Sequence, residues 1–291
     1  MNNKPLILID ANNVSHIALH SMGELSFLDM KTGVIFGFFV RLLKLWEEFQ
    51  SNQFVFCWDS RKRFRSAIYP EYKKGPSRSS SITPEQRVII SKQMEALQCE
   101  ILPALGFKNI LHQTGYEADD LITKAILRYE REFIVVSTDK DLFQTLAVGA
   151  CRFIYNTVTG KKMTRDLFRK TYQVEPFEWV KVKALAGDPS DNIPGVPGIG
   201  EKSAIAFVLD KLKGKKLQSI HESEAIIERN LKLVRLPFKQ PGFPLIVPDL
   251  QLDDLSVDRF IDVFDRYGFR SFLREEKLSK WKEFANDRNN H

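Results

Sequence analysis

The chain has 291 residues, of which 43% are hydrophobic and 27% charged, so it can bury a sizeable core and is not globally disordered. Its 43 Lys and Arg residues outnumber its 37 Asp and Glu residues, and the net charge of +6 weakly favours a polyanionic partner. Three cysteines without a CxxC spacing indicate free thiols in a reducing compartment, and they exclude a disulfide framework or a zinc site. No apolar stretch approaches the roughly 20 residues that cross a bilayer, so we expect a cytoplasmic protein.

Along the chain, short apolar strands alternate with helical patterns. Strands are predicted at residues 6–9, 54–58 and 133–136, and a helical pattern spans about 33–49. Continuous apolar strands between helices are typical of a parallel sheet that is covered on both faces. The sequence therefore predicts an α/β fold with a central, mostly parallel sheet flanked by helices.

Each of the three strands leads into an aspartate. Asp10 follows the first strand, Asp59 the second and, after a Ser-Thr pair, Asp139 the third. Ligands of open parallel sheets bind at the carboxyl ends of the strands. We therefore expect these three carboxylates to lie near one another at one edge of the sheet.

The segment after the second strand has a different composition. Residues 60–84 carry seven Lys or Arg residues and a single acid, and they end at Thr83-Pro84, a typical N-cap followed by Pro at the first helical position. A last strand or hairpin is predicted at about 152–159, and the pattern beyond is mostly helical. We accordingly divide the chain into residues 1–170, an α/β core with a basic loop, and residues 171–291, a mostly helical region.

Nine acidic residues stand out because they occupy strand ends, helix starts and tight turns. For any single pair of them, capping of a helix or turn is the more common role. So many carboxylates at one sheet edge would, however, repel one another and raise their pKa values, and oxygen-rich clusters suit hard cations such as Mg²⁺ or Mn²⁺. We therefore favour a two-metal site for phosphodiester hydrolysis. The nine are Asp10, Asp59, Glu117, Asp119, Asp120, Asp139, Asp141, Asp188 and Asp191.

A glycine-rich loop with a lysine, Gly195 to Lys202, joins two predicted helical segments. A nucleotide-binding GxGxxG loop or a P-loop does not fit, because no strand precedes the loop and the GKS/T signature is absent. A plain helix–helix turn stays open as an alternative. A helical hairpin that grips a DNA backbone without reading bases explains the glycines, the prolines and the lysine together. Its candidate DNA-binding residues are Gly195, Gly198, Gly200 and Lys202.

In this order the motifs resemble the 5′-nuclease family, which comprises flap endonucleases, phage 5′–3′ exonucleases and the nuclease domain of bacterial DNA polymerase I. The resemblance covers about residues 5–210. Its motifs are Ile9-Asp10, Trp58-Asp59, Phe64-Arg65, Tyr72-Lys73, Glu117-Ala-Asp-Asp120, Ser137-Thr-Asp-Lys-Asp141, Gly187-Asp-Pro-Ser-Asp-Asn192 and Gly195-Val-Pro-Gly-Ile-Gly-Glu-Lys202.

The resemblance implies a PIN-like nuclease core, a helical arch at about 60–95 and a helix–three-turn–helix DNA-binding motif at about 184–210. It implies two Mg²⁺ ions, for which Mn²⁺ can substitute, and a K⁺ ion at the loop of the helical motif. Asp10, Asp59, Glu117, Asp119 and Asp120 match the acids of the first metal, and Asp139, Asp141, Asp188 and Asp191 those of the second. The matching catalytic candidates near the scissile phosphate and the gateway of the arch are Arg65, Tyr72 and Lys73.

Two departures from the family pattern matter. Asp10 is followed by Ala11 where relatives commonly have Gly, which is harmless if the backbone angle there is negative. Relatives also often have an Arg three residues after the Tyr-Lys lysine, and here either Lys74 or Arg78 fills that DNA-binding role.

The resulting hypothesis is a monomeric, divalent-metal-dependent 5′ nuclease that hydrolyses DNA at 5′ flaps and 5′ ends in replication or repair. We expect it in the cytosol of a bacterium or a phage-infected host. An RNase or RNase H-like activity on the same scaffold stays open, because a carboxylate site does not choose the sugar and an RNA–DNA hybrid could bind. A non-catalytic binder of branched DNA is the third hypothesis.

Overall fold

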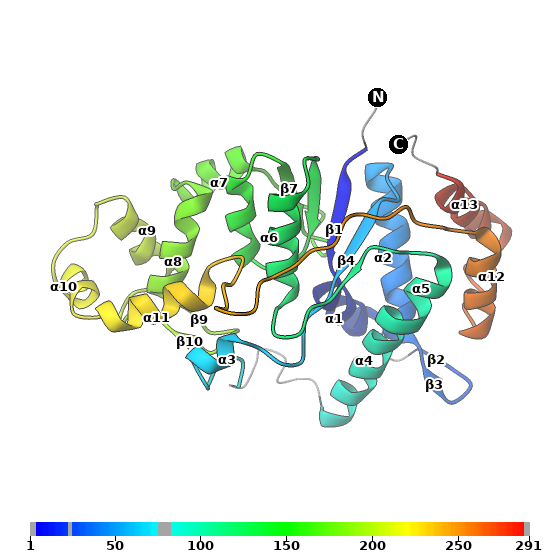
Figure 1. Ribbon diagram of the computed structural model, residues 1–291, viewed down its shortest axis with the longest axis horizontal. Coiled ribbons are helices and arrows are strands. Elements are labelled where there is room, and N and C mark those ends of the chain that lie inside the picture. Colours follow the sequence, from blue (N-terminus) through cyan, green and yellow to red (C-terminus); the bar gives the residue numbers. More distant parts are fainter. Residues whose placement is uncertain (1–3, 23–24, 75–82, 288–291) are drawn as a thin grey trace.

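The structure is a computed structural model that describes residues 4–22, 25–74 and 83–287. The molecule is elongated, with a central sheet between two groups of helices (Figure 1). One group, α8 to α11, lies beyond one edge of the sheet, and the C-terminal helices α12 and α13 lie at the opposite end. The described residues contain no helix that is both long and apolar enough to cross a membrane.

The central sheet has six strands in the order β5-β4-β1-β6-β7-β8. The first five run parallel, and β8 pairs antiparallel with β7 as the second arm of a hairpin. This arrangement confirms the predicted α/β fold and its mostly parallel sheet. The strands are β1 (Leu6–Asp10), β4 (Phe54–Cys57), β5 (Ile110–Leu111), β6 (Phe133–Val136), β7 (Cys151–Tyr155) and β8 (Lys162–Met163).

The buried strands divide their side chains between two apolar cores, because successive residues of a strand point to opposite faces. Ile7 and Ile9 of β1 face a core built with the N-terminal helices and with α12 and α13. Leu6 and Leu8 face a core built with α6, α7, α8 and α9. The helices of the first core are α1 (Ala11–Met22), α2 (Gly33–Phe49), α4 (Pro84–Ala96), the π-helical turn η1 (Leu97–Ile101), α5 (Leu102–Leu105), α12 (Val257–Arg266) and α13 (Glu275–Asn286).

The second face of the sheet is continuous with the helical group beyond its edge. α8 packs on the short helix η2, on α9 and on α11, so apolar contacts run without a break across residue 170. The packing marks no boundary there, and the division near residue 170 stays a prediction. The elements are α6 (Ala118–Arg128), η2 (Asp141–Ala147), α7 (Arg165–Tyr172), η3 (Pro176–Glu178), α8 (Trp179–Ala186), α9 (Glu201–Val208), α10 (Lys215–His221) and α11 (Glu224–Val234).

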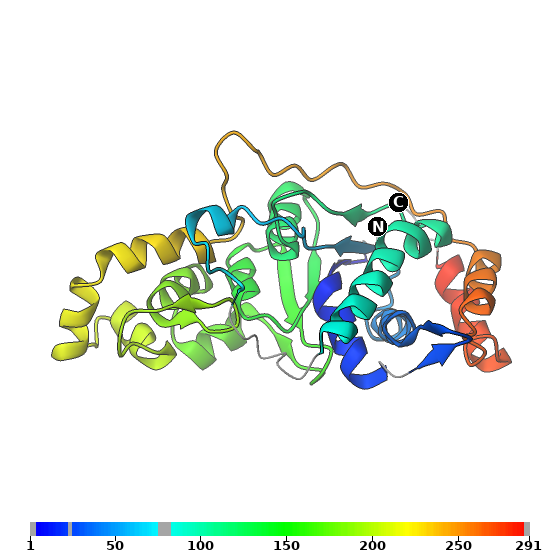
Figure 2. The same cartoon turned by 90° about the horizontal axis from the view of Figure 1, so that it is seen from below.

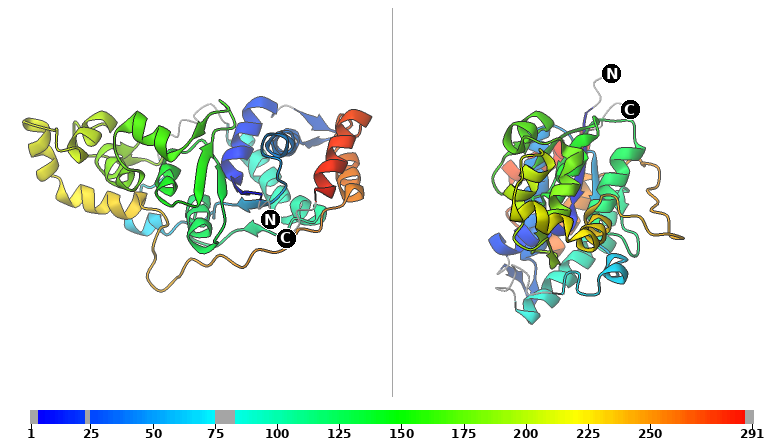
Figure 3. Two further views of the ribbon diagram at one scale, coloured as in Figure 1. Left: turned by 90° about the horizontal axis from the view of Figure 1, so that it is seen from above. Right: turned by 90° about the vertical axis from the view of Figure 1, so that its left-hand side faces the viewer.

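An extended strap, residues 235–256, connects α11 to α12 along the outside of the molecule (Figures 2 and 3). Side-chain amides hold it against the β5 edge of the sheet. Gln113 donates to the Pro244 carbonyl at 2.9 Å and accepts from the Ile246 N–H at 2.8 Å. Asn109 forms a similar reciprocal pair with the backbone of Gln251 at 2.8 and 2.9 Å. The strap thereby covers an edge strand that would otherwise be open.

The remaining elements are short. They are the hairpin β2 (Ser26–Phe27) and β3 (Met30–Lys31), α3 (Arg65–Ile68), and the ribbon β9 (Gly187–Asp188) with β10 (Ile193–Pro194). The predicted helix start at Thr83-Pro84 is confirmed, because Thr83 caps α4 in a capping box with Gln86. All three cysteines are free, as expected.

Candidate metal centre

The three strands whose ends carry aspartates are neighbours in the sheet, in the order β4-β1-β6. Asp10 is the last residue of β1, while Asp59 and Asp139 lie just beyond β4 and β6. The carboxyl ends of adjacent parallel strands meet at one edge, which brings the carboxylates of these loops together. Asp10 is almost buried, at 6% exposure, and accepts a hydrogen bond from the Ser137 hydroxyl at 2.8 Å.

Two asparagines at the start of α1 tie these loops to one another. The Asn12 side chain accepts a hydrogen bond from the backbone N–H of Asp59 at 2.8 Å. Asn13 donates its side-chain amide to the Thr138 hydroxyl at 2.7 Å, and its backbone N–H to Asp10 at 3.0 Å. Neither asparagine was among the predicted site residues, although their positions two and three residues after Asp10 could have suggested them.

α6 brings the next acids to the same edge. Glu117 is its N-cap, and the backbone N–H of Ala118 donates to the Asp59 carboxylate at 2.8 Å. In the described part of the chain, nothing donates a hydrogen bond to the Asp119 carboxylate. Burial raises the pKa of Asp119 well above its usual value, and the charges of Asp139 and Asp10 raise it further.

Two further carboxylates at this edge have raised pKa values. Burial, followed by the charge of Asp59, raises the pKa of Asp10 to about 7. Burial, followed by the charge of Asp139, raises the pKa of Asp141 to about 7 as well. Burial is the larger cause of both shifts, and repulsion between neighbouring carboxylates adds to it.

The donor set fits hard divalent cations, because it consists of carboxylate oxygens in a buried place that needs positive charge. Across residues 4–22, 25–74 and 83–287, no group of three or more Asp, Glu, His or Cys side chains is arranged to hold a metal ion. Asp10, Asp59, Asp119, Asp139 and Asp141 are the carboxylates of this edge that would hold such ions. Besides burial, the charge of Asp139 contributes to the raised pKa values of Asp10, Asp119 and Asp141, and the charge of Asp59 to those of Asp10 and Asp119, which places these five in one cluster.

Lys183 was not among the predicted site residues, yet it bridges two of the predicted metal ligands. Lys183 on α8 lies 2.7 Å from Asp141 and also contacts Asp188. Burial would raise the pKa of Asp188, but Lys183 and hydrogen bonds from Ser190 outweigh burial and lower it. Asp188 is therefore the better compensated of the two acids. Only a basic residue five positions before Asp188 hinted at this contact in the sequence.

A second group of polar side chains lies around Glu117. Lys73 lies 3.1 Å from Glu117 and 3.6 Å from Asp191, and the Tyr72 hydroxyl lies 2.7 and 2.9 Å from the same two carboxylates. Although burial acts in the opposite direction, Lys73 and Arg65 lower the pKa of Glu117 to about 2. Burial raises the pKa of Asp191 to about 6, against the charge of Lys73. The structure thus brings Tyr72, Lys73, Glu117 and Asp191 together.

Asp120 and Arg65 take a different role from the predicted one. They form a bidentate ion pair at 2.6 and 2.8 Å, with Asp120 fully buried and Arg65 3% exposed. The backbone N–H groups of Phe238 and Glu117 donate to Asp120 as well, at 2.7 and 3.1 Å. A carboxylate has about four acceptor positions, and all are used. Contrary to the prediction, Asp120 keeps no oxygen lone pair for a metal, and Arg65 is not free to approach a phosphate.

The glycines of the helical motif divide into two kinds. A Cβ atom on Gly195 would lie 2.4 Å from the Ala186 carbonyl group, and one on Gly187 would lie 2.3 Å from the backbone of Gly195. Both are therefore needed for the β9–β10 ribbon to pack on the end of α8. Gly198 and Gly200 have open space at this position, and Gly200 is the N-cap of α9.

The remaining DNA-binding candidates either lie at the surface or fall outside the residues that the structure describes. Lys202 is exposed in the first turn of α9, which places it beside the open glycines. Lys74 is exposed and lies 4.0 Å from Glu71. Arg78 falls in 75–82, outside the described residues, so the choice between Lys74 and Arg78 stays open.

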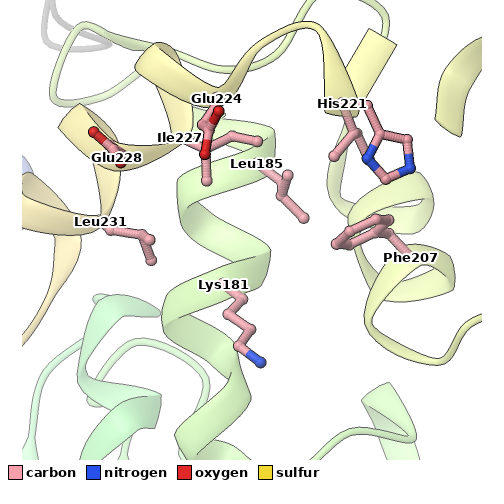
Figure 4. Close-up of a pocket in the computed structure, with 9 residues that line it drawn as sticks. Lys181, Leu185, Phe207, His221, Glu224, Ile227, Glu228 and Leu231 are labelled. Atoms are coloured by element: carbon pink, nitrogen blue, oxygen red, sulfur yellow. The ribbon is translucent and has the colours of Figure 1, made fainter. Parts of the chain in front are cut away.

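A cavity of about 440 Å³ lies between α8, α9, α10 and α11, apart from the carboxylates (Figure 4). Its lining combines apolar and charged side chains, and none of the predicted site residues lines it. It is lined by Lys181, Leu185, Phe207, Ile220, His221, Glu224, Ile227, Glu228 and Leu231.

Comparison with known families gives two adjoining matches. Residues 5–173 match the family described as "5′-3′ exonuclease, N-terminal resolvase-like domain", and residues 174–236 match "5′-3′ exonuclease, C-terminal SAM fold". The chain is 29% identical to DNA polymerase I of Bacillus caldotenax, over 94% of this chain and 32% of the polymerase. It is 27% identical to a 5′-3′ exonuclease of Buchnera aphidicola, over 89% of this chain and 93% of the relative. The chain thus spans about a third of the length of the polymerases that it matches.

Solved structures show the same fold at low sequence identity. T5 5′-exonuclease with bound zinc is 21% identical and superposes with a TM-score of 0.63, over 96% of this chain and 97% of the other. Flap endonuclease-1 from Methanococcus jannaschii is 15% identical, with a TM-score of 0.58, over 99% and 94%.

Proposed function

The chain belongs to the 5′-3′ exonuclease family, and from that premise we propose that it is a divalent-metal-dependent, structure-specific nuclease that cuts DNA at 5′ flaps and 5′ ends. The observation that carries the proposal is the cluster of buried carboxylates at the ends of β4, β1 and β6. Burial and neighbouring carboxylate charges raise the pKa values of Asp10, Asp119 and Asp141, and hard cations would supply positive charge to this cluster. In this proposal the protein acts as a monomer on DNA that is being replicated or repaired.

Five carboxylates would hold the metal ions. In the proposed arrangement Asp10, Asp59 and Asp119 hold one ion, and Asp139 and Asp141 hold the other. Two Mg²⁺ ions in such a site, or Mn²⁺ in their place, stabilise the attacking and leaving oxygens of an in-line phosphodiester displacement. Asp188 adjoins this set and shares Lys183 with Asp141, whereas Asp191 pairs with Lys73 and Tyr72 beside Glu117.

Lys73 is the cation best placed to meet the substrate. Its side chain is 27% exposed and its ammonium group lies 3.1 Å from Glu117 and 3.6 Å from Asp191. Glu117 stays ionised through its low pKa and keeps Lys73 charged and oriented. The role of Lys73 is to bind and orient the scissile phosphate next to the carboxylate cluster.

The start of α9 would hold the duplex. Gly198 and Gly200 leave room for a phosphate at the backbone, Lys202 adds positive charge, and the helix N-terminus favours an anion. Such contacts position DNA without reading its sequence. We retain K⁺ at this loop as part of the proposal; replacement of K⁺ by Li⁺ should then weaken duplex binding without changing Mg²⁺ binding.

Cleavage of a 5′-flap duplex tests the function. The purified chain is incubated with the labelled duplex in Mg²⁺, in EDTA and as the Asp119→Asn variant. We expect products from the 5′ side in Mg²⁺ alone, with a rate at least about a hundredfold lower in the variant. Absence of metal-dependent cleavage, with flap binding unaffected by Mg²⁺, would instead identify a non-catalytic DNA binder.

The sugar preference needs its own comparison, because carboxylates and metals do not distinguish DNA from RNA. DNA and RNA flaps of one sequence on the same DNA duplex are compared at equal concentration. Faster cleavage of the RNA flap or of an RNA–DNA hybrid would replace the DNA nuclease by an RNase H-like activity.

A further inference from the structure

We infer that Trp179 is a positioning residue for the metal centre: its indole N–H holds the Lys140 carbonyl and thereby sets the turn that carries Asp139 and Asp141. This inference rests on the proposed function, since it concerns the same site. Trp179 lies at the start of α8 and is fully buried. Its indole N–H donates to the Lys140 carbonyl oxygen at 2.8 Å, across 39 residues of sequence.

The turn at residues 139–141 connects β6 to η2. Asp139 accepts a hydrogen bond from the Asp141 N–H at 2.8 Å, so the two carboxylates are coupled through the backbone between them. Lys140 is the residue between, and its carbonyl also accepts from the Phe143 N–H at 3.1 Å in the first turn of η2. A shift of this carbonyl would therefore move both carboxylates.

The position of the indole is itself determined by packing. The Trp179 ring lies 4.7 Å from the ring of Tyr172 and 5.4 Å from that of Phe168, with Phe143 at 5.8 Å. A fully buried N–H that lost its acceptor would remain desolvated and unpaired, which is unfavourable. The aromatic cluster and the hydrogen bond together make α8 a rigid support for the turn.

α8 also contacts the turn at a second point, through Lys183. Lys183 follows Trp179 by four residues, which places both on one face of the helix. It pairs with Asp141 at 2.7 Å. A metal ion at Asp141 would share this carboxylate with the ammonium group, so metal binding directly changes this pair. The neutral bond from Trp179 involves no carboxylate and is compatible with both the metal-free and the metal-bound form.

The chain provides a matched control in Trp281 of α13. It is also fully buried among aromatic rings, but its indole N–H has no hydrogen-bond partner among the described residues. Trp281→Phe therefore removes a buried indole without breaking a hydrogen bond. Trp179→Phe removes a buried indole and also its hydrogen bond to the Lys140 carbonyl. A general effect of a smaller core side chain would appear in both variants.

The test measures metal binding and backbone dynamics separately from cleavage. Mn²⁺ is titrated calorimetrically into the full chain without DNA, and amide hydrogen exchange is followed in residues 137–147. For Trp179→Phe we expect about three- to tenfold weaker Mn²⁺ binding and a similar acceleration of exchange, which corresponds to the loss of one net hydrogen bond. Duplex binding in EDTA should be unchanged, and Trp281→Phe should show neither effect.

Wild-type Mn²⁺ affinity and exchange in Trp179→Phe, or the same changes in Trp281→Phe, would overturn the inference. If Trp179→Phe does not fold, 3-benzothienylalanine at position 179 retains the ring shape and removes only the N–H donor, and the same two outcomes decide. A wild-type chain that binds no Mn²⁺ and cleaves no flap would refute the proposed function. The exchange measurement would still decide whether Trp179 holds the turn.

Discussion

Asp119 and Asp120 are adjacent on α6, but replacement of each by its amide should have opposite effects on fold stability and metal binding. Asp119 faces other carboxylates without a hydrogen-bond donor among the described residues, whereas Asp120 is paired with Arg65. We predict that Asp120→Asn destabilises the fold and retains metal binding. Asp119→Asn should do the reverse.

The magnitude follows from burial. Arg65 is 3% exposed and Asp120 is fully buried, so the amide breaks the bidentate pair and leaves the buried guanidinium with Glu117 at 3.3 Å as a carboxylate partner. Loss of one partner of a buried ion pair costs about 3–5 kcal/mol of unfolding free energy, and 3 kcal/mol corresponds to roughly 6–12 °C in Tm for a chain of this size. Asp119→Asn removes charge repulsion, so the metal-free protein should keep its stability or gain about 1 kcal/mol.

The assay is thermal unfolding in EDTA combined with calorimetric Mn²⁺ titration of both variants at pH 7.5. A double variant, Arg65→Met with Asp120→Asn, serves as the control, because removal of both charges should cost less than the two single changes added together. Normal stability of Asp120→Asn with lost Mn²⁺ binding would refute the structural role of Asp120 and return it to the metal ligands.

Three further changes test other parts of the site. In EDTA the free energy of unfolding should fall as pH rises from about 4 to 7. The native state holds protons on Asp10 and Asp141 up to a pKa of about 7, whereas the unfolded chain releases them near 3.8. Urea titrations with and without Mg²⁺ check this prediction, and a flat profile in EDTA would contradict it. Lys183→Met should lower stability in EDTA at pH 8 by about 1–3 kcal/mol, since Asp141 and Asp188 lose their shared cation, and Lys181→Met, a neighbour outside the pair, should not. Gly195→Ala should cost about 2 kcal/mol or more in denaturant unfolding, because its Cβ would overlap the Ala186 carbonyl group, whereas Gly200→Ala, in open space, should cost much less; equal losses would show that packing does not explain Gly195.

Local patterns were sufficient for the elements and for most of the acids. Apolar runs at residues 6–9, 54–58 and 133–136 predicted three strands of a parallel sheet, because a strand that is buried on both faces is typically continuously apolar. The ends of such strands share one edge, so the positions of Asp10, Asp59 and Asp139 followed from the same rule. The Thr83-Pro84 helix start and the helix opened by Glu117 were equally local, since a cap depends on neighbouring residues.

Partners of those acids could be decided only by the tertiary structure. The pair of Arg65 and Asp120 joins residues 55 positions apart, and the bond from Trp179 to Lys140 spans 39. No periodicity in the sequence encodes which carboxylate meets a guanidinium and which meets only other carboxylates. A carboxylate becomes a metal ligand or half of an ion pair according to the charges that packing places around it, and packing is a property of the whole fold.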